Sequence, residues 1–181
     1  MPRYAAFLRG MNVGGHRLTN LELRALFSEL GFEDPVPFRT SGNVVFDTDE
    51  REAREALAAR IEEGLGAGLG YEVPVFLREA AEVNAIARHE PFPAATVEAS
   101  KGKLQVLLLA AKPRAKARDQ ALAHATDEDL LAIEGSELYW LPSGGISDSD
   151  LDLKAIGRLL GLGTMRTKGT IELIAAKHFS G

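Results

Sequence analysis

Short apolar runs and amphipathic stretches alternate along the first half of the chain. The apolar runs predict strands over residues 4–8, 36–39, 43–47 and 73–77. Helices are predicted to begin where Thr19 with Glu22, and then Asp49 with Glu52, form capping pairs. A further helix is predicted over about 80–89. The glycines at position 31 and over 64–70 are expected to end the first two helices, so the order of elements is βαββαβα.

The second half of the chain repeats this order. Strands are predicted over 103–109, 130–133 and 138–141, with an extended segment over 164–166. Helices are predicted over 114–125, after a cap at Asp150, and over 171–177. The tails of the halves also match at a spacing of about ninety residues: Arg78 with Arg166, Val83 with Ile171, and Ile86 with Ile174.

This repetition predicts an α+β fold. We expect two similar ferredoxin-like (split βαβ) subdomains, residues 1–92 and 100–181, packed as one compact unit. The segment 92–101 is interpreted as the linker, because proline, alanine and serine replace the periodic pattern there.

Composition narrows the classes of function. The chain has 181 residues, a formal net charge of −5 and no cysteine. An acidic chain lacks the positive field that draws proteins to nucleic acids and anionic membranes. The absence of cysteine excludes disulfides, zinc–thiolate sites and thiol nucleophiles, and favours a reducing cytoplasm. The apolar runs are too short for a signal peptide or a membrane span, so we expect a cytoplasmic protein with no membrane partner.

Two sequence motifs resemble a known family. Residues 8–15 read LRGMNVGG and residues 41–46 read SGNVVF. Together they resemble DUF1697, a bacterial family of unknown function whose pattern has an LRGINVGG stretch and an SGN-V-hydrophobic-Phe strand. The C-terminal signature of that family, Thr-x-Arg-Asn-Trp-x-Thr, is read onto Thr164, Arg166 and Thr170. The resemblance implies a two-subdomain α/β fold over essentially the whole chain, and it implies no activity.

This chain departs from the family pattern in two places. The Asn-Trp pair of the C-terminal signature is Thr167-Lys168 here, and the Ser-Lys that follows the second glycine turn is Ser147-Asp148. A ligand contact made by either pair in relatives would be altered in this chain.

The loop after the first strand is the strongest candidate for a binding site. Glycines permit close approach of backbone amides to an anion, and Gly14 and Gly15 stand in this loop with Arg9 and Asn12. A guanidinium can bind phosphate or carboxylate through two hydrogen bonds. The loop has neither a Walker pattern nor a GxGxxG fingerprint. A structural turn, with Arg9 paired to an acidic neighbour, explains the same residues at least as well.

Two further groups of residues are candidates for the same kind of ligand. Ser41 and Asn43, on either side of Gly42, could donate hydrogen bonds to the ligand near the end of the sheet, although tight-turn chemistry explains all three residues. Arg166, Thr164 and Thr170 would place a guanidinium and two hydroxyls beside a helix start. Arg78 is their counterpart in the first half, and a structural role for both arginines is an equal alternative.

No other pattern predicts a specific chemistry. The acidic run over 147–152 lacks the glycine and glutamate of an EF-hand loop and is better explained as helix capping. The four histidines lack metal-ligand spacing, so no metal site is predicted, and Trp140 is interpreted as a core or sheet-face residue.

We therefore expect a protein that binds a small anionic ligand, phosphate- or nucleotide-like, through residues 9–15. The alternatives are an enzyme acting on such a ligand, and a nucleic-acid-binding module, which the acidic charge disfavours. The sequence requires no cofactor, and it assigns neither a catalytic residue nor an oligomeric state.

Overall fold

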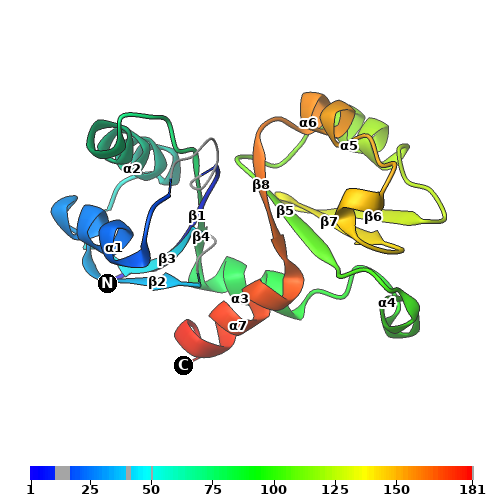
Figure 1. The fold of residues 1–181 in the computed structure, drawn as a ribbon, viewed down its shortest axis with the longest axis horizontal. Helices are drawn as coiled ribbons and strands as arrows, with labels where there is room; N and C mark the ends of the chain where they lie inside the picture. Colours follow the sequence, from blue (N-terminus) through cyan, green and yellow to red (C-terminus); the bar gives the residue numbers. More distant parts are fainter. Residues whose placement is uncertain (11–16, 40–41, 50, 181) are drawn as a thin grey trace. The chain divides into compact units, whose positions relative to one another are not determined.

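The computed structural model describes residues 1–10, 17–39, 42–49 and 51–180 and contains two units (Figure 1). Unit 1 is Met1–Asn84 together with Ile174–Gly181, and unit 2 is Ala85–Leu173. Each unit contains one four-stranded sheet.

Unit 1 is built on an antiparallel sheet with the strand order β2-β3-β1-β4. Its elements are β1 (Arg3–Leu8), α1 (Asn20–Glu29), β2 (Glu33–Phe38), β3 (Asn43–Asp47), α2 (Arg54–Leu69), β4 (Val75–Glu79) and the start of α3 (Ala80–Arg88). Strand β3 lies between β1 and β2, so the β1-α1-β2 unit is split by a third strand. This is the predicted split βαβ arrangement.

Local signals explain where the helices of unit 1 begin and end. The predicted capping box at α1 is present: the Glu22 amide donates to Thr19 Oγ1 at 3.1 Å, and the Thr19 amide donates to Glu22 Oε2 at 2.8 Å. The predicted cap at Asp49 and Glu52 is wrong, because α2 begins after Ala53 without a side-chain cap. Glu52 instead accepts from Nε of Arg60 at 2.8 Å.

One face of the first sheet packs on α1 and α2. The core there joins alternate residues of β1, β3 and β4 to the inner faces of both helices: Tyr4, Ala6, Leu8, Val44, Phe46, Val75 and Leu77 with Leu23, Phe27, Leu57, Ile61 and Leu65. The opposite face is buried as well, and it includes Phe7, Val45, Phe76, Asn43 and Arg78. Burial of both faces explains why these strands read as continuous apolar runs.

Unit 2 repeats the architecture with the strand order β6-β7-β5-β8, again antiparallel throughout. Its elements are the end of α3, α4 (Ala94–Ala99), β5 (Gln105–Leu109), α5 (Ala115–Leu122), β6 (Asp129–Glu134), β7 (Glu137–Pro142), the short 3-10 helix η1 (Ile146–Asp148), α6 (Leu153–Leu160), β8 (Gly163–Thr167) and the start of α7 (Lys168–His178). Helix α4 was not predicted and lies within the predicted linker. The cap of α6 is Asp152 rather than Asp150, since Asp152 Oδ1 accepts from the Ala155 amide at 3.0 Å.

The predicted fold class is confirmed, because both sheets have the order expected for split βαβ subdomains. The division between the units falls within helices rather than at the predicted limits of 1–92 and 100–181. Helix α3 changes unit after Asn84 and α7 changes unit at Ile174, so the last turns of α7 belong to unit 1. Within unit 1 these turns are fastened by Asn84, whose Nδ2 donates to the Phe179 carbonyl at 3.1 Å. No helix in the described ranges is long and apolar enough to cross a membrane.

Candidate functional site

Three connections of unit 1 meet at the end of the sheet where β1 finishes. The Leu8 amide donates to the Gly42 carbonyl at 2.8 Å, which joins the end of β1 to the turn that precedes β3. The Arg9 amide donates to the Pro74 carbonyl at 3.0 Å, which joins the same point to the start of β4. The described parts of the two motifs, Arg9 with Gly10 and Gly42 with Asn43, therefore lie at one end of one sheet.

The backbone at this end has the geometry that glycine permits. Gly10 has φ of +72° and Gly42 has φ of +76°, both in the left-handed region. Arg9 and Gly10 are exposed, whereas Gly42 is buried. A glycine at position 10 therefore lets the chain turn sharply beside an exposed guanidinium.

The structure places some of the predicted residues and not others. Asn12, Gly14, Gly15 and Ser41 lie outside the described residues. Asn43 is buried, and its Nδ2 donates to the Phe38 carbonyl at 3.0 Å. Such a bond closes the turn between β2 and β3, which is the structural alternative considered for Asn43.

A second arginine stands at the same end of the sheet. Strands β1 and β2 both run antiparallel to β3, so their carboxyl ends coincide, and Arg9 and Arg39 directly follow them. With one strand between them, the two backbones are about 10 Å apart. Glu62 on α2 is also at this end, where its Oε1 accepts from the Val75 amide at 2.9 Å. The sequence analysis missed Arg39, because a single arginine after a strand carries no motif.

Arg78 and Arg166 occupy equivalent positions in the two sheets. Arg78 is paired with Ala5 of β1, and Arg166 is paired with Val106 of β5. Each guanidinium donates through Nη1 to the carbonyl of the preceding residue, Leu77 at 2.8 Å and Met165 at 2.9 Å.

Both arginines are buried, with 1% and 9% of their surface exposed. Loss of solvation lowers the pKa of Arg166 to about 10, so this guanidinium stays protonated at neutral pH.

The C-terminal candidates divide into two pairs. Nη1 of Arg166 donates to Thr164 Oγ1 at 2.9 Å, so these two residues lie together as predicted. Thr170 contacts Thr167 instead: its amide donates to Thr167 Oγ1 at 3.2 Å, and the two hydroxyl oxygens lie 2.8 Å apart. Thr167 therefore caps the first turn of α7.

Lys168, at the position where the chain departs from the family signature, has a structural role. It is buried, and its Nζ donates to the Ala87 carbonyl at 2.8 Å and to Glu172 Oε1 at 2.7 Å. A cation at the carbonyl end of α3 is favoured by the helix dipole. The ammonium thus ties the start of α7 to the end of α3.

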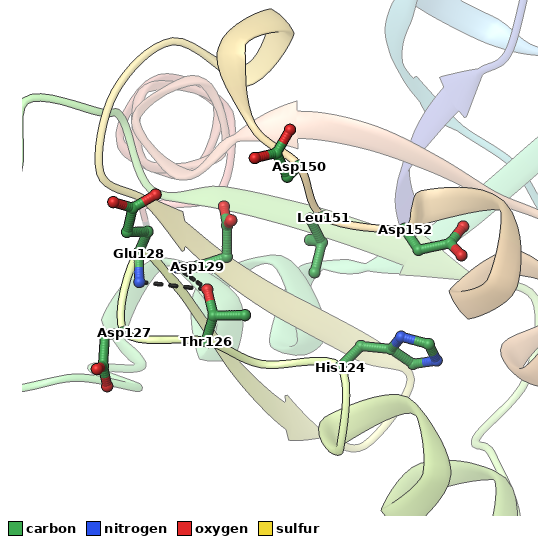
Figure 2. Close-up of a pocket in the computed structure, with 8 residues that line it drawn as sticks. All are labelled: His124, Thr126, Asp127, Glu128, Asp129, Asp150, Leu151 and Asp152. Carbon is green, nitrogen blue, oxygen red and sulfur yellow. Dashed lines mark hydrogen bonds between the residues drawn. The ribbon is translucent and has the colours of Figure 1, made fainter.

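Unit 2 also contains a pocket of about 490 Å³ lined mostly by acidic residues (Figure 2). Its lining residues are His124, Thr126, Asp127, Glu128, Asp129, Asp150, Leu151 and Asp152. Asp129 is buried, and its Oδ1 accepts from Trp140 Nε1 at 2.8 Å and from Ser149 Oγ at 2.7 Å. In the described part of the chain, no three His, Asp or Glu side chains are placed to hold a metal ion. An acidic lining disfavours an anionic ligand here, so the first sheet remains the better site.

Comparison with known proteins identifies the family. A family model described as "Protein of unknown function (DUF1697)" matches residues 1–139. The chain belongs to DUF1697. The match includes the Arg9 loop and the SGN turn but ends before Thr164, so it does not extend to the C-terminal signature.

A solved structure supports the fold. The conserved bacterial protein SP0830 from Streptococcus pneumoniae superimposes with a TM-score of 0.69 at 19% sequence identity, and the match covers 97% of each chain. No curated protein matches this DUF1697 chain. These comparisons establish the family and the fold and supply no activity.

Proposed function

We propose that this DUF1697 protein binds a small anionic ligand, phosphate- or nucleotide-like, at the end of the first sheet where β1 finishes. The observation that carries this proposal is the exposed Arg9 beside Gly10, which turns at a positive φ of +72°. The amides of Leu8 and Arg9 donate to the carbonyls of Gly42 and Pro74, so the backbone at the end of β1 is held against the segments that precede β3 and β4. Because the backbone of Arg9 is already held, binding an anion would order its side chain but not its backbone.

The chemistry of the site follows from the residues around this point. Arg9 would bind phosphate oxygens through two parallel hydrogen bonds, and the glycine backbone would let the anion approach main-chain amides. Asn12, Gly14, Gly15 and Ser41 complete the proposed site by their place in the two motifs. Gly42 and Asn43 support it by holding the turn between β2 and β3.

Arg78 and Arg166 are assigned a supporting role in this proposal. Both guanidinium groups are buried and donate to the backbone of their own strands, so they stiffen the ends of β4 and β8. Thr164 and Thr170 take the same role through their bonds to Arg166 and Thr167. The equal strand orders and the matched arginines also support an origin of the two units by internal duplication.

Thermal denaturation of the purified protein with anions tests the proposal. Inorganic phosphate, pyrophosphate and nucleoside phosphates are the probes, and a ligand at one hundred times its Kd raises stability by about 2.7 kcal/mol. Arg9→Ala is expected to abolish the shift in a protein that still folds, because Arg9 is exposed. Arg118→Ala, an exposed arginine on α5 in unit 2, is the matched control and should keep the shift. Unchanged affinity in a folded Arg9→Ala variant, or no response to any anion, would overturn the proposal.

A further inference from the structure

Two cations of unit 1 converge on one aromatic ring. Phe38 is the last residue of β2 and is half-buried. Cζ of Arg39 lies 5.7 Å from the centroid of its ring, and Nζ of Lys177, from the last turn of α7, lies 5.8 Å from it. The ring of His178 meets Phe38 edge-on at 6.0 Å. Residues 139 positions apart in sequence therefore form one basic cluster, which we define as Phe38, Arg39, Lys177 and His178.

The positive charge of this cluster is not balanced within it. Among the described residues, neither Arg39 nor Lys177 forms a salt bridge with a carboxylate, and both side chains belong to exposed residues. The nearby Arg3 is already paired with Asp47 at 2.7 Å. Each cation gains from the face of the aromatic ring, but the two cations repel each other.

The imidazole of His178 is also affected by the neighbouring cations. Burial, together with the charges of Lys177 and Arg3, lowers the pKa of its imidazole. Nε2 of His178 is buried and finds no hydrogen-bond partner in the part of the chain that the structure describes. Burial is the main cause of this shift, and the two neighbouring cations add to it.

The backbone of Arg39 adds an independent reason to look for a role. Its φ is +59°, in the left-handed region that glycine and asparagine occupy at lower cost. Turn formation alone would therefore favour a different residue at position 39. Strained positions of this kind often lie at binding sites.

We propose that Arg39 and Lys177 form a binding site for a phosphate dianion, with Phe38 holding the two cations in position. A compact group with two negative charges would relieve the repulsion between the cations and accept hydrogen bonds from both. The cluster has two exposed cations around one ring rather than a long basic groove, which favours a single phosphate group over a nucleic-acid backbone. This site uses neither Arg9 nor Gly10, although Arg39 follows β2 at the end of the sheet where Arg9 follows β1, so the variants below separate the two sites.

Nuclear magnetic resonance titration with pyrophosphate at low salt tests the proposal. The imidazole resonances of His178 are expected to shift in a saturable manner, because the ring lies against Phe38. The titration is repeated with inorganic phosphate and with a sugar phosphate. The comparison shows whether the site prefers a free phosphate or a phosphate ester. If a single-stranded oligonucleotide shifts these resonances and the small phosphates do not, the proposed ligand class is wrong.

Matched variants identify the residues responsible. Lys177→Gln and Arg39→Gln each replace the cation with a shorter, neutral polar side chain and are each expected to weaken pyrophosphate binding by about tenfold, since each removes a charged donor. Lys154→Gln, an exposed lysine on α6, is the control and should bind as the parent protein does. Unchanged affinity in both folded cluster variants would overturn the proposal.

Arg9→Ala distinguishes this site from the loop site. The variant is expected to keep the His178 shift even where it loses the thermal response of the loop. If Arg9→Ala removes the His178 shift as well, the separate phosphate site does not exist. If Lys177→Gln removes the shift and Arg9→Ala does not, the cluster stands whether or not the loop binds an anion.

Discussion

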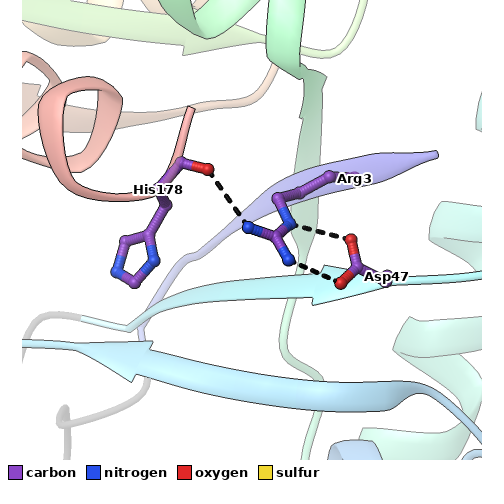
Figure 3. Close-up of polar contacts among 3 residues, drawn as sticks. All are labelled: Arg3, Asp47 and His178. Atoms are coloured by element: carbon purple, nitrogen blue, oxygen red, sulfur yellow. Dashed lines mark hydrogen bonds and ion pairs between the residues drawn. The ribbon is translucent and has the colours of Figure 1, made fainter. Parts of the chain in front are cut away.

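The guanidinium of Arg3 holds the carboxylate of Asp47 through two hydrogen bonds, Nε to Oδ1 at 2.8 Å and Nη2 to Oδ2 at 2.7 Å (Figure 3). Nη1 of the same guanidinium donates to the His178 carbonyl at 3.2 Å. One side chain therefore joins the start of β1, the end of β3 and the last turn of α7. A cation is favoured there, because the free carbonyls at a helix end carry partial negative charge.

Loss of this junction is expected to have a modest cost. Arg3→Ala should lower the free energy of unfolding by about 1 kcal/mol, because a partly exposed ion pair contributes little in water. The side chain of Arg3 is 44% exposed, so water screens its attraction to Asp47 and keeps the cost small. Urea denaturation checks the value, with Arg118→Ala as the exposed control. A loss as large as that of a core substitution would contradict this account.

The Asp47 carboxylate makes stability depend on pH in acid. The hydrogen bonds from Arg3 lower the pKa of Asp47 below its ordinary value of 3.8. The unfolded chain then binds a proton more readily than the folded one, so this contribution is present above about pH 4 and is lost as the pH falls through the folded pKa. Asp47→Asn should remove the contribution of this carboxylate to the pH dependence. Urea denaturation recorded at several pH values from about 4 downwards measures it. An identical acid profile in the variant would contradict the assignment.

His178 makes stability depend on pH in a higher range. Its pKa is lowered below 6.5, chiefly by burial and further by Lys177 and Arg3. The folded state therefore disfavours the charged imidazole, and its stability should fall as the pH drops below about 6.5. His178→Gln is expected to flatten the profile below about pH 6.5, as measured by urea denaturation. A profile that stays equally steep would assign the effect to other groups.

Lys168 and Glu172 are partners with unequal importance. Lys168→Ala should cost about 2 kcal/mol, because it removes a buried donor from the Ala87 carbonyl as well as the ion pair. Glu172→Gln should cost less than about 1 kcal/mol, since the Glu172 side chain is 50% exposed and Lys168 keeps its bond to Ala87. Chemical denaturation of the two variants gives the comparison. Equal costs would show that the ion pair, rather than the bond to α3, stabilises the helix.

Asp129 links two segments of unit 2 through Trp140 and Ser149. Asp129→Ala should destabilise the protein by about 3 kcal/mol, since it leaves the buried indole N–H without its acceptor. Ser149→Ala removes the bond to Asp129 and the acceptor of the Leu151 amide, and should cost about 1 kcal/mol, because the indole N–H keeps its partner. Trp140 is the single tryptophan, so its fluorescence follows unfolding of this region directly. Equal stability of the parent and Asp129→Ala would contradict the proposed role.

Patterns close together in the sequence were sufficient to predict the order of elements apart from α4 and η1. The Thr19–Glu22 capping box and the glycine at position 31 depend on atoms within one turn of α1, so the sequence alone determines them. The order βαββαβα, repeated once, leaves few sheets that obey right-handed crossovers, and split βαβ is among them. Fold class therefore followed from local pattern.

Tertiary structure decided everything that depends on which segments meet. Both Asp150 and Asp152 offer a capping carboxylate, and α6 begins at Leu153, so Asp152 is the cap. The last turns of α7 belong to unit 1, and only this return brings His178 to Arg3 and Lys177 to Phe38. Side chains so far apart in sequence have no shared period or motif. Their contacts arise from strand register and helix packing, which the sequence specifies only through the whole fold.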